Sequence, residues 1–357
     1  MEDVIEAPEQ VTPEWLTSAL FKSGFLKSGK VIYLKNTLTK TLPLSVVARF
    51  EVRYSEGAAG SPPTKLFLKL PGPDLSKSFS SELNSKEADF YNIVAPEMKD
   101  PPFISCFSAT FSPASGKSHL LLEDLTETHF QPLSPYPPSR SYCELAMDCM
   151  ARLHAHWWEH PRLGKEIGAL FDRAQLNAFV AELEKNVLNF VDFLRDGLSA
   201  ERRKIYDRLL SSSYKIWGRL TERTGLTVTH GDAHWWNLLY PRERNTHGVR
   251  LFDWHLWHVD VGARDLAFMV ALGGYSERRA AIEQSLIRRY YESLVAHGVT
   301  NYSWNDCWDD YRWSAIRNLN IPIIQWIQEK STEEWRRNLE RAMDAYEDLR
   351  CFDLLNK

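Results

Sequence analysis

The stretch Thr229–Asn237 reads THGDAHWWN, and it is followed at Val249–Trp254 by VRLFDW. An apolar run, Leu226–Val228, stands directly before the first stretch and favours a short strand that ends in a polar loop. Another apolar run opens the second stretch. The turn-forming residues of Pro241–Gly248 separate the two, as in a hairpin connection. The sequence therefore predicts two neighbouring strands whose ends carry polar side chains.

Three of these side chains offer oxygen atoms, namely Asp232, Asn237 and Asp253. Carboxylate and amide oxygens are hard ligands that suit magnesium bound together with substrate phosphates. A carboxylate that stays off the metal can instead receive the proton of a hydroxyl group. The pattern thus indicates phosphate chemistry with a metal and a general base.

The order H-G-D-x-x-x-x-N followed by D-W resembles the signature of the aminoglycoside phosphotransferase and choline kinase family, small-molecule relatives of the protein kinases. The matching residues are His230, Asp232, Asn237 and Asp253. A lone His-Gly-Asp is a weak signal, whereas the extended pattern is specific. The resemblance implies an α+β, bilobal protein-kinase-like fold with a small antiparallel β-sheet lobe and a larger, mostly helical lobe.

The apolar patterns of the chain agree with this fold. Strand-like runs stand at 31–34, 45–54, 65–70, 103–111 and 119–122. Most of the second half has helical spacing. A chain of 357 residues is also longer than one core usually serves. We therefore expect a nucleotide-binding lobe at 1–122, a hinge at 123–128, and a helical lobe with the catalytic loop and acceptor pocket at 129–357.

Lys69 stands inside the apolar run Leu66–Leu70. A buried, unpaired ammonium is costly, so this lysine needs an anionic partner unless it faces solvent from an edge strand. The resemblance implies a lysine that contacts nucleotide phosphates and pairs with a helix glutamate. The segment around Glu87 looks like the family's E-x-x-F-Y pattern, which favours Glu87 as that partner, with Glu82 as the alternative.

The segment Leu120–Leu125 reads LLLEDL and resembles the family's interlobe hinge, L-x-x-E-D-L. The resemblance implies that backbone groups of Glu123, Asp124 and Leu125 bind the adenine edge. An acidic turn at the end of a strand is the alternative interpretation. This segment, together with 87–91 and 153–158, looks most like the ecdysteroid-kinase-like branch, which hints at a bulky, apolar hydroxyl compound as acceptor.

The resemblance also assigns roles to the catalytic residues. Asp232 orients and deprotonates the acceptor hydroxyl, and His230 holds the catalytic loop. Asn237 and Asp253 hold Mg²⁺, while Asp265 braces the loop. The expected donor is ATP or GTP, and the expected acceptor is a small molecule with a hydroxyl group.

One departure from the family concerns the first hairpin, residues 36–45, which contains no glycine. Glycine lets backbone N–H groups approach phosphate closely. We expect hydroxyls of Thr39, Thr41 or Ser45 to donate instead, and the choice of nucleotide stays open.

Aromatic residues gather beside the motif and could hold an acceptor by stacking or cation–π contact. These are Trp235, Trp236, Trp254 and Trp257. Core packing is the competing explanation for each of them. Asp309 belongs to an acidic and aromatic cluster at 304–310 that would suit a cationic acceptor, although a solvated helix start explains it equally well.

The composition bears on the binding partners and the cellular compartment of the protein. A net charge of −4 gives no indication of nucleic-acid binding. Scattered, odd-numbered cysteines and the lack of an apolar leader or an 18-residue apolar run favour a cytoplasmic protein that does not cross a membrane. Monomer and homodimer both stay open. Two rival functions are a catalytically inactive binding module of the same fold and a metal-dependent hydrolase. The hydrolase would take its zinc or iron ligands from His230-x-Asp232-x-His234 and His255-x-x-His258.

Overall fold

The computed structural model describes residues 4–72, 77–222, 224–243 and 247–356. The chain forms two compact units. The first comprises Met1–Phe130 with Leu239–Trp257, and the second comprises Gln131–Leu238 with His258–Lys357. The sequence pattern places all of 129–357 in the second lobe, whereas the structure assigns 239–257 to the first. The difference arises because Tyr240 pairs with Phe130 across two short strands.

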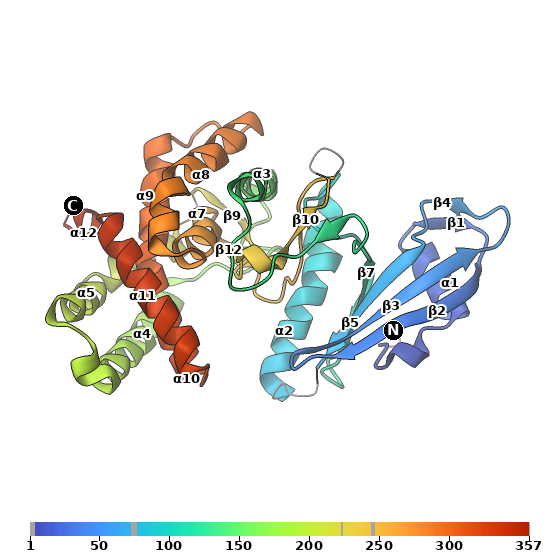
Figure 1. Cartoon of the computed structure of the whole chain (residues 1–357), viewed down its shortest axis with the longest axis horizontal. Coiled ribbons are helices and arrows are strands. Elements are labelled where there is room, and N and C mark those ends of the chain that lie inside the picture. Colours follow the sequence, from blue (N-terminus) through green and yellow to red (C-terminus); the bar gives the residue numbers. More distant parts are fainter. Residues whose placement is uncertain (1–3, 73–76, 223, 244–246, 357) are drawn as a thin grey trace. The chain divides into compact units, whose positions relative to one another are not determined.

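An antiparallel five-stranded sheet forms the centre of the first unit (Figure 1). Its strands, in spatial order, are β2 (Val31–Thr41), β3 (Ser45–Tyr54), β5 (Lys65–Pro71), β7 (Ser118–Glu123) and β6 (Cys106–Phe111). Residues alternate along β3, so that Ala48, Phe50 and Val52 are buried while Glu51 and Arg53 are exposed. The buried face joins a core with residues such as Leu66 and Leu68 of β5.

Helices and short strands complete the first unit. They are η1 (Pro8–Gln10), α1 (Pro13–Lys22), α2 (Lys77–Asp89), the π-helix η2 (Phe90–Val94), η3 (Ala95–Glu97), β1 (Leu26–Ser28), β4 (Ala59–Gly60), β8 (His129–Phe130), β10 (Leu238–Pro241) and β11 (Arg250–Leu251). Thr12 caps α1 by accepting a hydrogen bond from the Trp15 N–H at 3.1 Å, as a threonine before a helical proline predicts.

The second unit is mostly helical. Its helices are α3 (Arg140–Trp157), α4 (Arg173–Leu194), η4 (Arg195–Gly197), α5 (Ala200–Ser211), α6 (Ser213–Trp217), η5 (Gly218–Thr221), η6 (Trp235–Asn237), α7 (Ala263–Leu266), the π-helix η7 (Ala267–Leu272), α8 (Ser276–Ala296), α9 (Trp304–Arg317), η8 (Asn318–Asn320), α10 (Ile321–Ile327), α11 (Thr332–Asp348) and α12 (Phe352–Leu355). A two-stranded antiparallel ribbon, β9 (Leu226–Thr229) with β12 (His258–Val261), lies among them. In the described part of the chain, no helix is long and apolar enough to cross a membrane.

The structure thus shows the expected fold class, a β-sheet unit and a larger helical unit. The 3₁₀ turn Asn318–Asn320 separates α9 from α10, and Pro322 stands in the first turn of α10. A proline fits there because the first N–H groups of a helix have no partner within that helix.

Candidate functional site

The loop that follows β9 carries Asp232. All four residues of β9 are buried, and pairing with β12 fixes the strand, with Thr229 opposite His258. The Asp232 N–H donates to Nδ1 of the buried His230 at 3.3 Å. His230 therefore supports the backbone of the residue proposed as the base.

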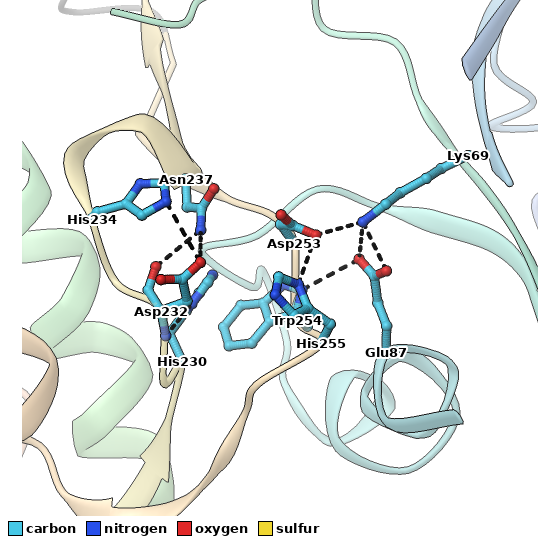
Figure 2. Close-up of polar contacts among 9 residues, drawn as sticks. All are labelled: Lys69, Glu87, His230, Asp232, His234, Asn237, Asp253, Trp254 and His255. Atoms are coloured by element: carbon cyan, nitrogen blue, oxygen red, sulfur yellow. Dashed lines mark hydrogen bonds and ion pairs between the residues drawn. The ribbon is translucent and has the colours of Figure 1, made fainter. Parts of the chain in front are cut away.

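Asn237 closes the same loop. Its Nδ2 donates to the Asp232 carbonyl oxygen at 2.9 Å and to Asp232 Oδ2 at 3.1 Å, as Figure 2 shows. Both bonds use the amide nitrogen, so Oδ1 is the atom of Asn237 suited to a metal ion. His234 Nε2 also lies 3.5 Å from Asp232 Oδ2. The structure therefore brings Asp232 and Asn237 together and adds His234 to them.

Asp265 of helix α7 holds the backbone of this loop through hydrogen bonds. Its Oδ2 accepts a hydrogen bond from the His230 N–H at 2.6 Å, and its Oδ1 accepts one from the Gly231 N–H at 3.0 Å. Burial alone would raise the pKa of Asp265, but hydrogen bonds from His154 and His230 outweigh it and lower the pKa. The carboxylate is therefore ionised, as an acceptor for several N–H groups must be.

In the first unit, Lys69 of β5 meets Glu87 of α2. Lys69 Nζ lies 2.9 Å from Oε1 and 2.8 Å from Oε2 of Glu87, and it also contacts Asp253 (Figure 2). The alternative partner Glu82 is exposed. Trp254 N–H donates to Glu87 Oε1 at 3.3 Å, so Glu87 binds the lysine and the backbone next to Asp253 together.

The charges of this cluster shift one another's pKa. Burial alone would lower the pKa of Lys69, but Asp253 and Glu87 outweigh it and raise the pKa above its usual value. Burial alone would raise the pKa of Asp253, but Lys69 and His255 hold it well below the usual range. His255 Nδ1 lies 3.0 Å from Asp253 Oδ1. Asp253 is thus an ionised carboxylate at neutral pH. Its backbone has a φ of 71°, which is unusual for a residue other than glycine.

The glycine-free hairpin differs from its expected form. Thr39 and Thr41 lie within β2, and Thr39 is exposed and pairs with Ala48. The connection is a tight turn closed by Leu42 N–H donating to the Ser45 carbonyl at 2.7 Å. Ser45 lines a cavity of about 110 Å³ together with Lys69, Glu87 and Asp253. The structure therefore places Ser45, and not Thr39, beside the lysine cluster.

Backbone pairing restricts the predicted hinge contacts. Glu123 N–H donates to the Ser105 carbonyl at 2.9 Å within the sheet. The Leu125 carbonyl accepts from Thr128 and His129, at 3.1 and 2.8 Å. The Asp124 side chain accepts from Thr126 N–H at 3.0 Å, which shapes the turn. The Glu123 N–H is therefore already used, and a nucleotide base would have to bind different backbone groups of this segment.

Three of the four tryptophans near the motif are buried in packing contacts. Trp254 is 0% exposed and stacks on Phe90 with ring centroids 3.7 Å apart. Trp257 donates through Nε1 to the Lys86 carbonyl at 2.7 Å, and Trp235 is 2% exposed. The competing explanation, core packing, accounts for these three. Trp236 alone among the four is only partly buried.

Asp309 lies away from Asp232 within the second unit. It lines a cavity of about 440 Å³ with Gly225, which precedes β9, whereas Asp232 follows β9. Four residues of strand span about 13 Å. Asp309 also pairs with Arg312 Nη1 at 3.1 Å. We therefore leave Asp309 out of the proposed acceptor site.

In the part of the chain that the structure describes, no ligand cluster supports the metal-dependent hydrolase. Among the described residues, no group of three or more His, Cys, Asp or Glu side chains could hold a metal ion. His230 instead supports the loop backbone, and His255 pairs with Asp253.

Sequence reasoning missed two members of the site. The sequence suggests His234 and His255 only as metal ligands of a hydrolase, although each stands two residues after an aspartate that it contacts. The spacing Asp-x-His was the available signal. Tyr290, which hydrogen-bonds to His154, carries no motif and could not have been found.

The comparison with protein families decides the classification. The model described as the ecdysteroid kinase-like family matches residues 44–299, more than half of the 357 residues. The chain belongs to the ecdysteroid kinase-like family. This small-molecule kinase-like family agrees with the resemblance carried by the motifs around Asp232 and Asp253. No curated protein matches the chain.

Solved structures support the fold of this ecdysteroid kinase-like protein. A mutant aminoglycoside 2'-phosphotransferase IIIa in complex with GDP is similar over 96% of this chain and 99% of its own, with a TM-score of 0.52 and 12% identity. An aminoglycoside phosphotransferase from Alicyclobacillus acidocaldarius matches 99% and 97% of the two chains, with a TM-score of 0.51 and 13% identity. A choline kinase from Cryptosporidium parvum matches 90% of each chain, with a TM-score of 0.51 and 12% identity.

Proposed function

We propose that this protein is a magnesium-dependent kinase that transfers the γ-phosphate of ATP or GTP to a hydroxyl group of a small organic acceptor. The observation that carries the proposal is the ion-paired cluster in which Lys69 lies against Glu87 and Asp253. A lysine so held keeps its charge and its place, as a phosphate-binding lysine requires. Membership of a family of small-molecule kinase-like proteins supports the same function.

In the proposed reaction, Asp232 accepts the proton of the acceptor hydroxyl. The hydroxyl oxygen forms a bond to the γ-phosphorus, and the bond between that phosphorus and the bridging oxygen of the β-phosphate breaks. The nucleoside diphosphate leaves with the bridging oxygen. The protein supplies mainly position and charge for such a transfer. Two hydrogen bonds fix the position of the base: Asn237 Nδ2 donates to the Asp232 carboxylate, and the Asp232 N–H donates to His230 Nδ1.

Asp253 of the first unit and Asn237 of the second each carry a donor atom of the kind that Mg²⁺ prefers. Asp253 offers an ionised carboxylate and Asn237 offers its amide oxygen, both hard oxygen donors. Bound Mg²⁺ would neutralise charge on the nucleotide phosphates. Magnesium commonly keeps water and phosphate oxygens as its remaining ligands, so two protein ligands suffice. Asp253 would then share its oxygens between the metal and Lys69.

The nucleotide site of the proposal uses Lys69, Ser45 and the hinge backbone. The GDP bound to one structural neighbour makes GTP as well as ATP a donor to test. The acceptor site is proposed to include the partly buried Trp236, whose carbonyl accepts a hydrogen bond from Gln131 Nε2 at 2.6 Å. An aromatic face there would suit a bulky, apolar alcohol.

A screen of hydroxyl compounds, with ATP or GTP and Mg²⁺, tests the proposal through release of nucleoside diphosphate. Release that depends on an acceptor, and is absent for the Asp232→Ala variant, is the expected result. Nucleotide binding without release of nucleoside diphosphate for any acceptor would favour the inactive binding module. The glycine-free turn at residues 42–44 is the feature that agrees with that alternative. Absence of both binding and release would reject the proposal.

A further inference from the structure

A chain of buried hydrogen bonds connects α8 with the loop that carries Asp232. The Tyr290 hydroxyl lies 2.8 Å from His154 Nδ1, and His154 Nε2 lies 3.2 Å from Asp265 Oδ2. Tyr290, His154 and Asp265 are each at most 1% exposed. Buried polar groups must find hydrogen-bond partners inside the protein. The position of the hydrogen in one of these bonds therefore determines which group donates in the next.

The direction of each hydrogen bond follows from chemistry. The ionised carboxylate of Asp265 can only accept, so His154 Nε2 carries a hydrogen and donates it. A Tyr290 hydroxyl that donates to Nδ1, 2.8 Å away, leaves that atom without a hydrogen of its own. Burial raises the pKa of Tyr290 well above its usual value, so the hydroxyl keeps the hydrogen that it donates. Tyr290 thereby selects the His154 tautomer that can bind Asp265.

Gly262 lies beside the hydrogen bond between Tyr290 and His154, where a larger residue would not fit. A Cβ atom on Gly262 would lie 2.5 Å from the Tyr290 hydroxyl oxygen and 2.7 Å from His154 Nδ1. Both distances are too short for non-bonded atoms. The backbone of Gly262 is helical, with φ of −58°, so alanine would fit its backbone but would push the hydroxyl and the ring apart.

We propose that His154, in the tautomer selected by Tyr290, is a positioning residue that orients the Asp265 carboxylate and thereby the loop backbone at His230 and Gly231. His154 touches neither substrate nor the reacting atoms. It acts through Asp265, whose oxygens accept from His230 N–H and Gly231 N–H at 2.6 and 3.0 Å. The inference deepens the proposed function and rests on it, since the loop it orients carries the base.

Hydrogen–deuterium exchange tests the positioning without any need for activity. In Gly262→Ala, the amides of the loop 230–232 exchange faster than in the wild type, because the Asp265 carboxylate is no longer held. The matched control is Gly218→Ala, since Gly218 also has a helical φ, −56°, and nothing lies within 4 Å of its added Cβ. Unchanged loop exchange in a folded Gly262→Ala protein would overturn the proposal.

Two substitutions of His154 separate positioning from packing. Glutamine can place an amide N–H near the position of Nε2, whereas methionine fills the space without a donor. We expect His154→Met to lower kcat by roughly 10- to 100-fold, as removal of supporting hydrogen bonds does at other sites, with little change in the KM for nucleotide. His154→Gln should recover most of that loss. Equal kcat for the two variants, with equal melting temperatures, would overturn the proposal.

Nitrogen NMR of the wild-type ring keeps the proposal testable even if every His154 variant fails to fold. The expected spectrum shows hydrogen on Nε2 and none on Nδ1 at neutral pH. Hydrogen on Nδ1 would overturn the proposal. If the protein transfers no phosphate to any acceptor, the proposed function fails by itself, whereas the exchange and NMR measurements still decide whether His154 orients the loop.

Discussion

Lys69 and Glu87 form a two-pronged ion pair, with Nζ 2.9 Å from one carboxylate oxygen and 2.8 Å from the other. The pair joins strand β5 to helix α2, and Glu87 also accepts a hydrogen bond from Trp254 N–H. One glutamate therefore fixes both the lysine and the chain segment that presents Asp253. Charge-assisted bonds with this geometry are stronger than neutral ones, so the cluster is ordered before any nucleotide arrives.

Replacement of Lys69 by methionine should weaken nucleotide binding. A hydrogen bond to a charged group contributes about 1.5–3 kcal/mol, so the dissociation constant should rise about 10- to 100-fold. Isothermal titration calorimetry with ATP and with GTP measures it. Lys65→Met is the matched control, because Lys65 stands on the same strand but is half-exposed and pairs with Glu127. Similar losses in the two variants would mean that Lys69 has no special role.

Asp232→Ala should abolish phosphate transfer and spare nucleotide binding. Loss of a general base costs about 100-fold or more in kcat. The matched control is Asp309→Ala, an aspartate of the same unit that lies at the other end of β9 and pairs with Arg312. We expect its kcat and acceptor KM to equal those of the wild type. A variant of Asp232 that retains more than about a tenth of the wild-type rate would show that another group accepts the proton.

Asp253→Asn should remove the dependence of nucleotide binding on magnesium. The substitution keeps the size of the side chain but removes the charge that Mg²⁺ and Lys69 both require. Binding of ATP is measured with Mg²⁺ and again after chelation. The wild type should bind more weakly after chelation, whereas the variant should bind equally weakly in both conditions. Retained magnesium dependence in the variant would exclude Asp253 from the metal site.

Ser45→Ala and Thr39→Ala decide between two hydroxyls in the glycine-free hairpin. Ser45 lines the cavity beside Lys69, and Thr39 accepts a hydrogen bond from Asn36 Nδ2 at 2.9 Å on an exposed strand. A neutral hydrogen bond contributes about 0.5–1.5 kcal/mol, so Ser45→Ala should raise the nucleotide KM by about 2- to 10-fold. Thr39→Ala should leave it unchanged. The reverse result would show that the hydroxyl of Thr39, and not that of Ser45, contacts the nucleotide.

Local patterns in the sequence predicted those parts of the site that depend on neighbouring residues. The strand with Lys69, the helix with Glu87 and the loop from His230 to Asn237 each carry a pattern over a few positions. The assignment of 239–257 to the first unit had no such pattern, because it depends on the pairing of Tyr240 with Phe130, 110 positions earlier in the chain.

The length of strand β2 was also predicted wrongly, because it depends on pairing with another strand. Residues 36–41 are polar and read as a loop, yet they extend β2, with Thr41 paired to Val46. An exposed edge strand needs no apolar residues, so polarity alone does not separate it from a turn. The turn itself comprises residues 42–44, and Gly72, which follows β5, packs against it: the Gly72 N–H donates to the Leu44 carbonyl at 3.1 Å, and a Cβ there would lie 2.5 Å from the Pro43 oxygen. That contact joins segments far apart in the chain and is not visible in the sequence.

The ion pair of Asp260 with Arg317 should make the stability of the protein depend on acid. Arg317 Nη1 and Nη2 lie 3.1 and 2.6 Å from the two carboxylate oxygens, and Asp260 is 1% exposed. Burial alone would raise the pKa of Asp260, but the charge of Arg317 outweighs it and holds the pKa well below its usual range. A carboxyl group whose pKa is lowered by folding stabilises the folded state above its unfolded pKa of about 3.9 and loses that contribution as the pH falls further.

Asp260→Asn should therefore lower the free energy of unfolding at pH 7 by about 3–5 kcal/mol, because Arg317 keeps its charge without a carboxylate partner. Below pH ~4 the difference from the wild type should shrink, because the carboxyl group of the unfolded wild type binds a proton while the folded pair, with its lower pKa, is still ionised. Urea unfolding at pH 7 and at pH 3 measures both values, with the exposed Asp196→Asn as control. A difference that stays constant between the two pH values would show that the destabilisation comes from packing and not from the charge of Asp260.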